Sequence, residues 1–203
     1  MEPALPDPIA ESTPGGVWIL NGTSSSGKSS LVEELRVRLR QPTLAFSVDD
    51  LFRMAHWHVH GQREGFRFDR DGAAVRIAIG SVGAQMVSAW RRAAATLWFS
   101  GVYVLVDDVR FNDSWQSEWR SCLNEIPHKF IGVHCDLATL EHRELARGDR
   151  EIGLARGFFP DVHRGVRYDV EVDTKQLSPE QATDQIAAAF GVGLHQRPEE
   201  SDG

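Results

Sequence analysis

The hydrophobic positions of this chain fall into short runs that alternate with longer periodic stretches. The short runs are rich in β-branched residues and apolar at nearly every position, which is typical of strands buried on both faces. They predict strands over Val17–Asn21, Thr43–Val48, Val102–Asp107, Phe130–Cys135 and Val170–Val172. Helical spacing between the runs predicts helices over Lys28–Leu39, Gly83–Phe99, Trp115–Glu125, Leu137–Arg147 and Pro179–Phe190. The alternation favours an α/β fold, in which helices cover a parallel sheet.

A single domain, residues 15–190, contains this whole pattern. A chain of 203 residues can bury one sizeable core but is short for two domains. The Pro-rich start, residues 1–14, and the acidic end, residues 191–203, predict disordered tails. Between the second and third predicted strands, Met54–Gly72 is charged, rich in aromatic residues and too irregular to assign.

The formal net charge is −7, and much of it lies in the two predicted tails, so the body is close to neutral. Such a body offers no broad footprint for nucleic acid or for an anionic membrane, and we expect neither partner. Only Cys122 and Cys135 occur, which indicates reduced thiols and not a disulfide framework. Because we see neither a signal-peptide pattern nor a run long enough to span a membrane, the sequence predicts a cytoplasmic protein. It leaves the oligomeric state open.

A complete phosphate-binding loop pattern, G-x-x-x-x-G-K-[ST], follows the first predicted strand directly. Its glycines would let backbone N–H groups close around phosphates, the Lys28 ammonium would reach the β and γ oxygens, and the Ser29 hydroxyl would ligate Mg²⁺. The alternative is a turn rich in Ser and Gly with an incidental lysine, which need not stand between a buried strand and a helix. The predicted nucleotide-binding residues are Gly22, Thr23, Ser24, Ser25, Ser26, Gly27, Lys28, Ser29 and Ser30.

Acidic residues follow two of the predicted strands, where ligands bind in open parallel sheets. The third strand ends in Asp107 and Asp108, a Walker B pattern that would hold Mg²⁺ together with Ser29. Aspartates at strand ends also serve as caps or turn residues, so one of the two can be structural. The second strand is followed by Asp49, which suits a base that accepts the proton of an alcohol during phosphoryl transfer. The alternative for Asp49 is a cap of a helix that starts near Leu51.

Arginines recur at short intervals among glycines between the fourth and fifth predicted strands. Arg147 and Arg150 lie near the turn, and we predict that they close over the transferring group as part of a mobile lid. A solvated helix with ordinary Glu/Arg pairs is the alternative, and it applies most readily to Arg143 and Arg156.

Seven segments, which follow one another from about Trp18 to Phe190, resemble chloramphenicol phosphotransferase and its relatives. The segments are Ile19–Ser29, Leu44–Asp49, Phe68–Gly72, Val106–Val109, Gly132–Asp136, Ala146–Arg150 and Tyr168–Thr174. The resemblance implies a P-loop kinase-like three-layer fold with a central five-stranded parallel sheet, and ATP-dependent phosphorylation of the primary hydroxyl of chloramphenicol. It also implies that Asp49 is the base.

The chain departs from the family pattern directly after Asp49, where an acceptor should bind. His56, His58 and His60 at alternate positions would suit either a zinc site or one polar face of a strand, and the second is the better interpretation because no cysteine or acidic partner lies close by in the sequence. We expect this segment to line a modified acceptor pocket, with Arg53 and Trp57 beside Asp49 as substrate-binding residues.

The sequence as a whole predicts an O-phosphotransferase that uses ATP and Mg²⁺ and acts on a hydroxyl of a small molecule. Chloramphenicol or another antibiotic is the predicted acceptor, with resistance as the outcome. The alternatives are a P-loop kinase of a metabolite or of a nucleic-acid end, and a nucleotide-binding regulatory module without an acceptor.

Overall fold

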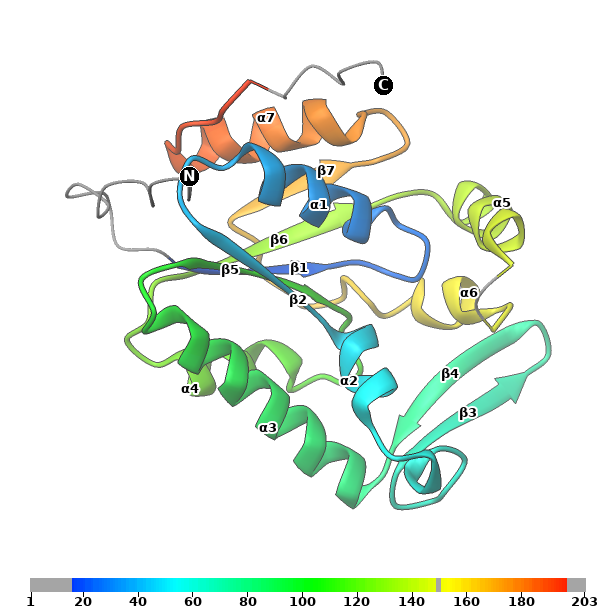
Figure 1. The fold of residues 1–203 in the computed structure, drawn as a ribbon. Helices are drawn as coiled ribbons and strands as arrows, with labels where there is room; N and C mark the ends of the chain where they lie inside the picture. Colours follow the sequence, from blue (N-terminus) through cyan, green and yellow to red (C-terminus); the bar gives the residue numbers. More distant parts are fainter. Residues whose placement is uncertain (1–15, 149–150, 197–203) are drawn as a thin grey trace, which may run out of the picture.

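The computed structural model describes residues 16–148 and 151–196, and its centre is a five-stranded parallel sheet with the strand order β2-β5-β1-β6-β7 (Figure 1). The strands are β1 (Val17–Asn21), β2 (Thr43–Ser47), β5 (Tyr103–Asp108), β6 (His128–His134) and β7 (Val170–Asp173). Every neighbouring pair in this sheet is parallel, so the predicted sheet is confirmed.

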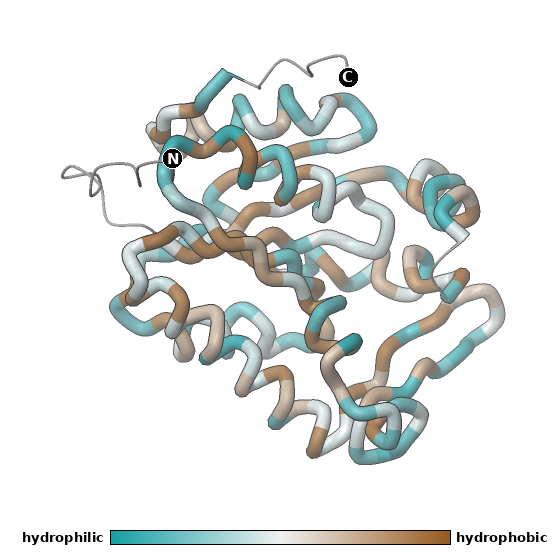
Figure 2. The backbone as a smooth tube through the Cα atoms, in the orientation of Figure 1, coloured by the Kyte–Doolittle hydropathy of each residue, from teal (hydrophilic) through white to brown (hydrophobic). Residues whose placement is uncertain are grey.

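Two layers of helices cover the sheet because consecutive residues of each central strand face opposite sides. Val17 and Ile19 of β1 belong to the core cluster under α3 and α4, whereas Trp18 and Leu20 belong to the cluster under α1 and α7. The helices are α1 (Lys28–Arg38), α3 (Ser81–Trp98), α4 (Trp115–Leu123) and α7 (Pro179–Phe190). Figure 2 shows hydrophobic positions gathered along the central strands, where full burial of one large apolar side chain is worth about 1.5–3 kcal/mol.

The prediction that all five strands are buried on both faces was wrong for the two edge strands, β2 and β7. Leu44 of β2 is 42% exposed, and Glu171 of β7 is exposed as well. An apolar run cannot reveal its place in the strand order, because that order depends on crossovers between distant segments.

The stretch that seemed irregular contains regular structure. It includes the short 3-10 helix η1 (Trp57–Val59) and the strand β3 (Phe66–Asp71), which pairs antiparallel with β4 (Ala74–Ile79). This hairpin projects beside α6 (Leu154–Phe158) in Figure 1. The two pack closely at Gly157, where a Cβ atom would lie 1.8 Å from the Val75 carbonyl oxygen. The hairpin was missed because most of β3 is charged and exposed.

The carboxyl end of the packed structure extends past the predicted boundary at residue 190. Val192 and Leu194 pack against the core cluster under α1 and α7, and His195 N donates to Arg38 O at 2.7 Å. The remainder of the predicted tails lies outside the described residues. Within the described ranges, no helix is long and apolar enough to cross a membrane.

Candidate active site

A pocket opens at the carboxyl ends of the parallel strands, beside the phosphate-binding loop. The helices α2 (Val48–Met54) and α5 (Leu137–Arg147) contribute to its walls together with β4, β5 and α6. It is lined by Ser24, Ser25, Ser26, Gly27, Lys28, Ser29, Ser30, Val48, Asp49, Phe52, Ile77, Asp107, Val109, Arg147, Leu154 and Phe158. The structure therefore brings most of the predicted nucleotide-binding residues together with Asp49, Asp107 and Arg147.

The phosphate-binding loop is tightly folded between β1 and α1. Gly22 admits no side chain, because a Cβ atom there would lie 2.5 Å from Val133 O and 2.6 Å from Ser26 Oγ. The hydroxyls of Ser24, Ser25 and Ser26 are buried and have no hydrogen-bond partner within the described part of the chain. Buried hydroxyls that lack a partner are costly, and phosphate oxygens would satisfy them. The loop thus fits the phosphates of a nucleotide.

Lys28 points back into this loop and not towards solvent. Its Nζ donates to Gly22 O at 2.8 Å and to Thr23 O at 3.0 Å, and it lies 3.7 Å from Asp107 Oδ1. An ammonium group has three donors. Two of them are held by carbonyl oxygens, and the third remains directed at the carboxylate or at a phosphate.

A hydroxyl and a carboxylate meet at the metal position that the sequence predicts. Ser29 Oγ donates to Asp107 Oδ2 at 2.7 Å. Oxygen ligands of these two kinds suit Mg²⁺, which usually keeps several waters and binds phosphates as well. Residues 16–148 and 151–196 contain no group of three His, Cys, Asp or Glu side chains that could hold a metal alone. The pair fits an ion that is shared with phosphates.

Asp108, the other predicted metal ligand, has a different environment. Its side chain is fully buried and does not line the pocket. Oδ1 accepts from Val109 N at 2.8 Å, and Oδ2 accepts from the indole N–H groups of Trp115 at 2.8 Å and Trp119 at 2.7 Å. Burial raises the pKa of this carboxyl group. Asp108 therefore anchors α4 to the sheet, and the geometry favours Asp107 as the metal ligand.

Asp49 lies in the first turn of α2 and faces the pocket. The alternative role as a helix cap does not apply, because α2 starts at Val48 and Ser47 Oγ accepts the capping hydrogen bond from Asp49 N at 3.2 Å. The adjacent Asp50 forms an ion pair with Arg53 instead. Of the two acidic residues after β2, only Asp49 lines the pocket.

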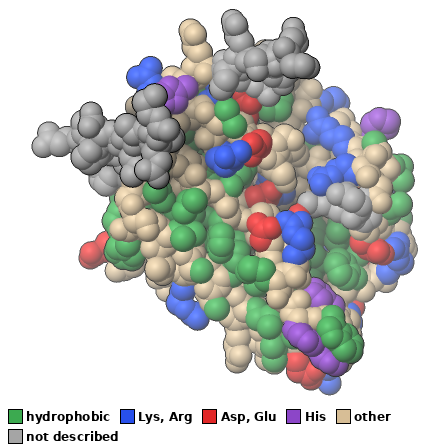
Figure 3. Space-filling view, in the orientation of Figure 1, with side chains coloured by type: hydrophobic (Ala, Val, Ile, Leu, Met, Phe, Trp, Pro, Cys, Tyr) green, Lys and Arg blue, Asp and Glu red, His purple; other side chains and the backbone are tan. Residues whose placement is uncertain are grey.

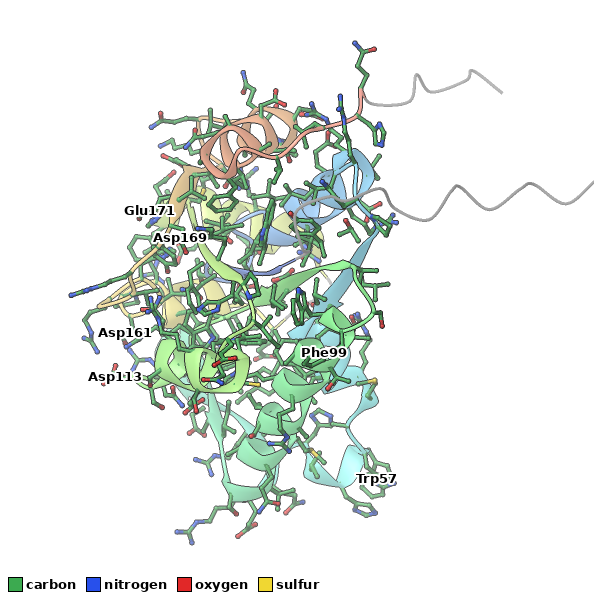
Figure 4. All side chains as sticks on the ribbon, turned by 90° about the vertical axis from the view of Figure 1, so that its left-hand side faces the viewer. Trp57, Phe99, Asp113, Asp161, Asp169 and Glu171 are labelled. Atoms are coloured by element: carbon green, nitrogen blue, oxygen red, sulfur yellow. The ribbon has the colours of Figure 1, made fainter. Side chains whose placement is uncertain are left out.

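The structure does not bring Arg53 and Trp57 to this pocket. Arg53 is exposed, and Trp57 is 69% exposed and stacks on His58 with ring centroids 3.5 Å apart. Figure 4 shows Trp57 at the end of the molecule opposite α7. Figure 3, in the orientation of Figure 1, shows histidines beside apolar side chains at the lower end of the molecule. His56 and His58 lie at and inside η1, so the expected strand face was wrong.

An apolar wall that the sequence did not reveal stands next to Asp49. Its members come from α2, β4, the segment after β5, and α6, and they are Val48, Phe52, Ile77, Val109, Leu154 and Phe158. Phe52 could have been found, because it follows Asp49 by three positions and so shares its helix face. The contributions of β4 and α6 could not, because neither element was recognised.

The predicted lid begins at the pocket. Arg147 ends α5 and lines the pocket, whereas Arg150 lies outside the described residues. The segment that starts at Glu151 is connected to α5 through Glu144, whose carboxylate accepts hydrogen bonds from Gly153 N and Ala155 N at 2.8 Å each. Arg156 forms an ion pair with Glu141, in agreement with the alternative considered for it.

A second hollow adjoins the phosphate-binding loop between α1, α5 and the start of α7. It is lined by Ser25, Gly27, Ser30, Leu31, Arg143, Ala146, Arg147, Thr174, Leu177, Pro179 and Ala182. Arg143 donates to Thr174 O at 2.8 Å and to Thr174 Oγ1 at 3.1 Å, so it braces this wall and is not an ordinary surface ion-pair residue. The mixture of apolar side chains and two guanidinium groups, those of Arg143 and Arg147, suits a flat nucleotide base.

The fold and the loop define a nucleotide-binding protein with the P-loop kinase fold. A family profile described as chloramphenicol phosphotransferase-like protein matches residues 15–191. The chain belongs to this family, as its motifs indicated, and is a phosphotransferase.

Known proteins agree with this assignment. A Mycobacterium tuberculosis H37Rv protein, whose name proposes an O-phosphotransferase, is 27% identical over 177 residues, which cover 79% of this chain and 75% of that protein. The Deinococcus radiodurans tunicamycin resistance protein has a TM-score of 0.60 at 15% identity and covers 90% of this chain and 99% of its own. The M. tuberculosis APS kinase, solved with AMPPNP and APS, has a TM-score of 0.61 at 14% identity, with 89% and 99% covered. Both structural likenesses concern the fold.

Proposed function

We propose that this protein transfers the γ-phosphoryl group of ATP, with Mg²⁺, to a hydroxyl of a small and largely apolar molecule, and that chloramphenicol or another antibiotic is such an acceptor. One observation carries the proposal. A single pocket has the phosphate-binding loop at one end and Asp49 beside an apolar wall at the other. The pocket can therefore place a phosphoryl donor against an alcohol.

At the donor end, the residues present would hold the nucleotide in an extended arrangement. The loop amides, the three buried serine hydroxyls and the Lys28 ammonium would surround the phosphates, and the second hollow would take the base. Ser29 and Asp107 would hold Mg²⁺, whose charge neutralises the phosphate oxygens during transfer. Arg147 would add a guanidinium at the same place.

At the acceptor end, Asp49 would orient the hydroxyl and take its proton. The acceptor oxygen forms the new bond to the γ-phosphorus, the bond to the bridging oxygen breaks, ADP leaves, and the proton passes to the Asp49 carboxylate. Alignment of the two reactants is the larger part of such catalysis.

The wall around Asp49 bears on the class of acceptor. The side chains that line the pocket there are aliphatic or aromatic. Among the described residues that line it, the two cations are Lys28 and Arg147, which we assign to the phosphate end. Acceptors with phosphate or carboxylate groups would find no cationic partner on the apolar wall. An uncharged, partly aromatic alcohol fits it better. This favours an antibiotic-like acceptor over a nucleic-acid end or a sugar acid.

The test is a coupled ADP-release assay over a panel of alcohols, with mass spectrometry of each product. We expect a mass gain of one phosphoryl group on an apolar alcohol such as chloramphenicol, and ADP release that depends on the acceptor. ATP hydrolysis that does not depend on an acceptor would instead indicate a nucleotide-binding regulatory module. Phosphorylation restricted to anionic metabolites or nucleic-acid ends would indicate a kinase that acts on one of those two classes.

A further inference from the structure

Asn21, the last residue of β1, is fully buried and makes hydrogen bonds in three directions. Its Oδ1 accepts from Arg110 N at 2.8 Å, and its Nδ2 donates to Val162 O at 2.7 Å and to Tyr168 OH at 2.6 Å. A backbone N–H can only donate and a carbonyl can only accept, so these partners determine the orientation of the amide. Nearly all of its hydrogen-bonding capacity is used.

Two of these partners join segments that are far apart in the sequence. Arg110 lies shortly after the end of β5 at Asp108, and Val162 lies shortly after the end of α6 at Phe158. The Arg110 guanidinium is itself buried and donates from Nη1 to Asp161 O at 2.7 Å. The segment after β5 and the segment after α6 are thus fastened to each other as well as to β1.

The third partner extends the network within the segment after α6. Because Tyr168 OH accepts from Asn21, its own proton is available to His163 Nδ1, 2.7 Å away. Burial is the main cause that lowers the pKa of His163 to about 3, so the ring is neutral near pH 7 and Nδ1 can accept. Asn21, Tyr168 and His163 form one continuous chain of hydrogen bonds behind the loop.

The segments gathered on Asn21 carry the walls of the pocket. Gly22, the next residue, begins the phosphate-binding loop. Val109, which precedes Arg110, and Phe158 of α6 both line the pocket. The loop also contacts α6 directly, since Thr23 Oγ1 donates to Ala155 O at 3.2 Å. A displacement of either segment would therefore shift the apolar wall relative to the phosphates.

We propose that Asn21 is a positioning residue, which holds the acceptor wall in register with the phosphate-binding loop. This inference rests on the proposed phosphoryl transfer, but it concerns a residue that touches neither reactant. Its loss would disturb the alignment of acceptor and donor and leave the phosphate contacts in place. Misplacement by about 1 Å can cost up to ~100-fold in rate.

The experiment compares Asn21→Ala and Tyr168→Phe with Ile186→Ala, a control in the fully buried core under α7. We expect kcat to fall at least about tenfold in Asn21→Ala and less in Tyr168→Phe, with the Kd for Mg²⁺–ADP changed by no more than about threefold. Ile186→Ala should lose melting temperature without loss of kcat when all proteins are assayed well below their transitions. Unchanged kcat in both test variants would overturn the proposal.

Hydrogen exchange gives a readout that is independent of activity. Residues 109–113 and 154–168 should exchange faster in Asn21→Ala than in the native protein, and should not do so in Ile186→Ala. If the native protein phosphorylates no acceptor, the proposed function fails while exchange still decides whether Asn21 positions these segments. Unchanged exchange in both segments would refute the positioning role even if the enzyme is active. If Asn21→Ala does not fold, Tyr168→Phe serves for both measurements.

Discussion

The Ser29 hydroxyl donates a 2.7 Å hydrogen bond to Asp107 Oδ2, which joins the first turn of α1 to the end of β5. The next residue, Asp108, accepts hydrogen bonds from two tryptophans in the core and from Val109 N. Consecutive residues of a strand point to opposite faces, and this alternation separates the two carboxylates into different environments.

That separation predicts opposite phenotypes for the two aspartates. Asp107→Asn should lower kcat and raise the Mg²⁺ concentration needed for half-maximal rate, with little change in melting temperature. Asp108→Asn replaces one of the two oxygens by an NH₂ group, which would face either the two indole donors or the Val109 N–H donor. This costs about 1–3 kcal/mol per unsatisfied group and should lower the melting temperature by several degrees. Magnesium titrations and thermal unfolding of both variants check this. Equal loss of stability in the two would contradict it.

Lys28→Ala should abolish most of the activity. The ammonium is the one Lys side chain in the phosphate-binding loop, and preorganised donors of this kind are worth about 3–4 kcal/mol in barrier, or a 10²–10³-fold loss of kcat. We expect the melting temperature to change little, because two of the partners that Lys28 leaves are loop carbonyls and the third, Asp107, keeps its hydrogen bond from Ser29. Steady-state kinetics and calorimetry give the two readouts, and near-normal turnover would refute the phosphate-binding role.

Asp49→Asn keeps the size of the side chain but cannot take a proton. If Asp49 is the base, kcat should fall by about 10²–10⁴-fold while nucleotide affinity stays nearly intact. Asp50→Asn is the matched control, since Asp50 sits one position along α2 and pairs with Arg53 outside the pocket. Full kcat in Asp49→Asn would show that another group accepts the proton.

Phe52 and Trp57 test where the acceptor binds. Phe52→Leu shortens a side chain of the apolar wall and should weaken acceptor binding by about two- to tenfold, as expected for the loss of one aromatic contact of about 0.5–1.5 kcal/mol. Trp57→Ala removes a larger ring that is 69% exposed and does not line the pocket, so acceptor affinity should not change. Direct titration with the best acceptor is the measurement. If Trp57→Ala weakened acceptor binding and Phe52→Leu did not, Trp57 would belong to the acceptor site.

The decrease of the free energy of unfolding at acid pH should depend in part on Asp136, the N-cap residue of α5. Hydrogen bonds from the side chain of Thr139, and then from Lys175, lower the pKa of this carboxyl group from 3.8 to about 2. Since the folded pKa is the lower one, the unfolded chain binds more protons between about pH 4 and pH 2. The stabilisation is present above that window and is lost as the pH falls through it.

Asp136→Asn isolates this effect, because asparagine also caps helices well but carries no charge. Urea unfolding from pH 6 to pH 2 should show a shallower decline in the free energy of unfolding for Asp136→Asn than for the native protein. Parallel declines would mean that Asp136 contributes nothing to the decrease at acid pH.

The elements that the sequence predicted well are those whose pattern is set by burial or by local backbone chemistry. Central strands such as β1 are apolar at nearly every position, because both faces pack against helices. Ser178 directly precedes Pro179 and stands three positions before Gln181, which is the local pattern of a helix start, and the structure shows it in a capping box with Gln181. The hairpin β3–β4 was not predicted, because β3 is mostly charged and β4 packs against α6, which lies more than 70 residues away along the chain.

The sequence by itself determined the phosphate-binding loop, the α/β alternation and the family, because these depend on residue types at short and regular spacing. Only the tertiary structure decided which of Asp107 and Asp108 meets Ser29, that Phe52 and not Trp57 stands beside Asp49, and that Asn21 gathers three segments behind the loop. These relationships arise where the chain returns from distant elements to one edge of the sheet. Strand order and side-chain direction at that edge are set by packing of the whole core, which no local pattern encodes.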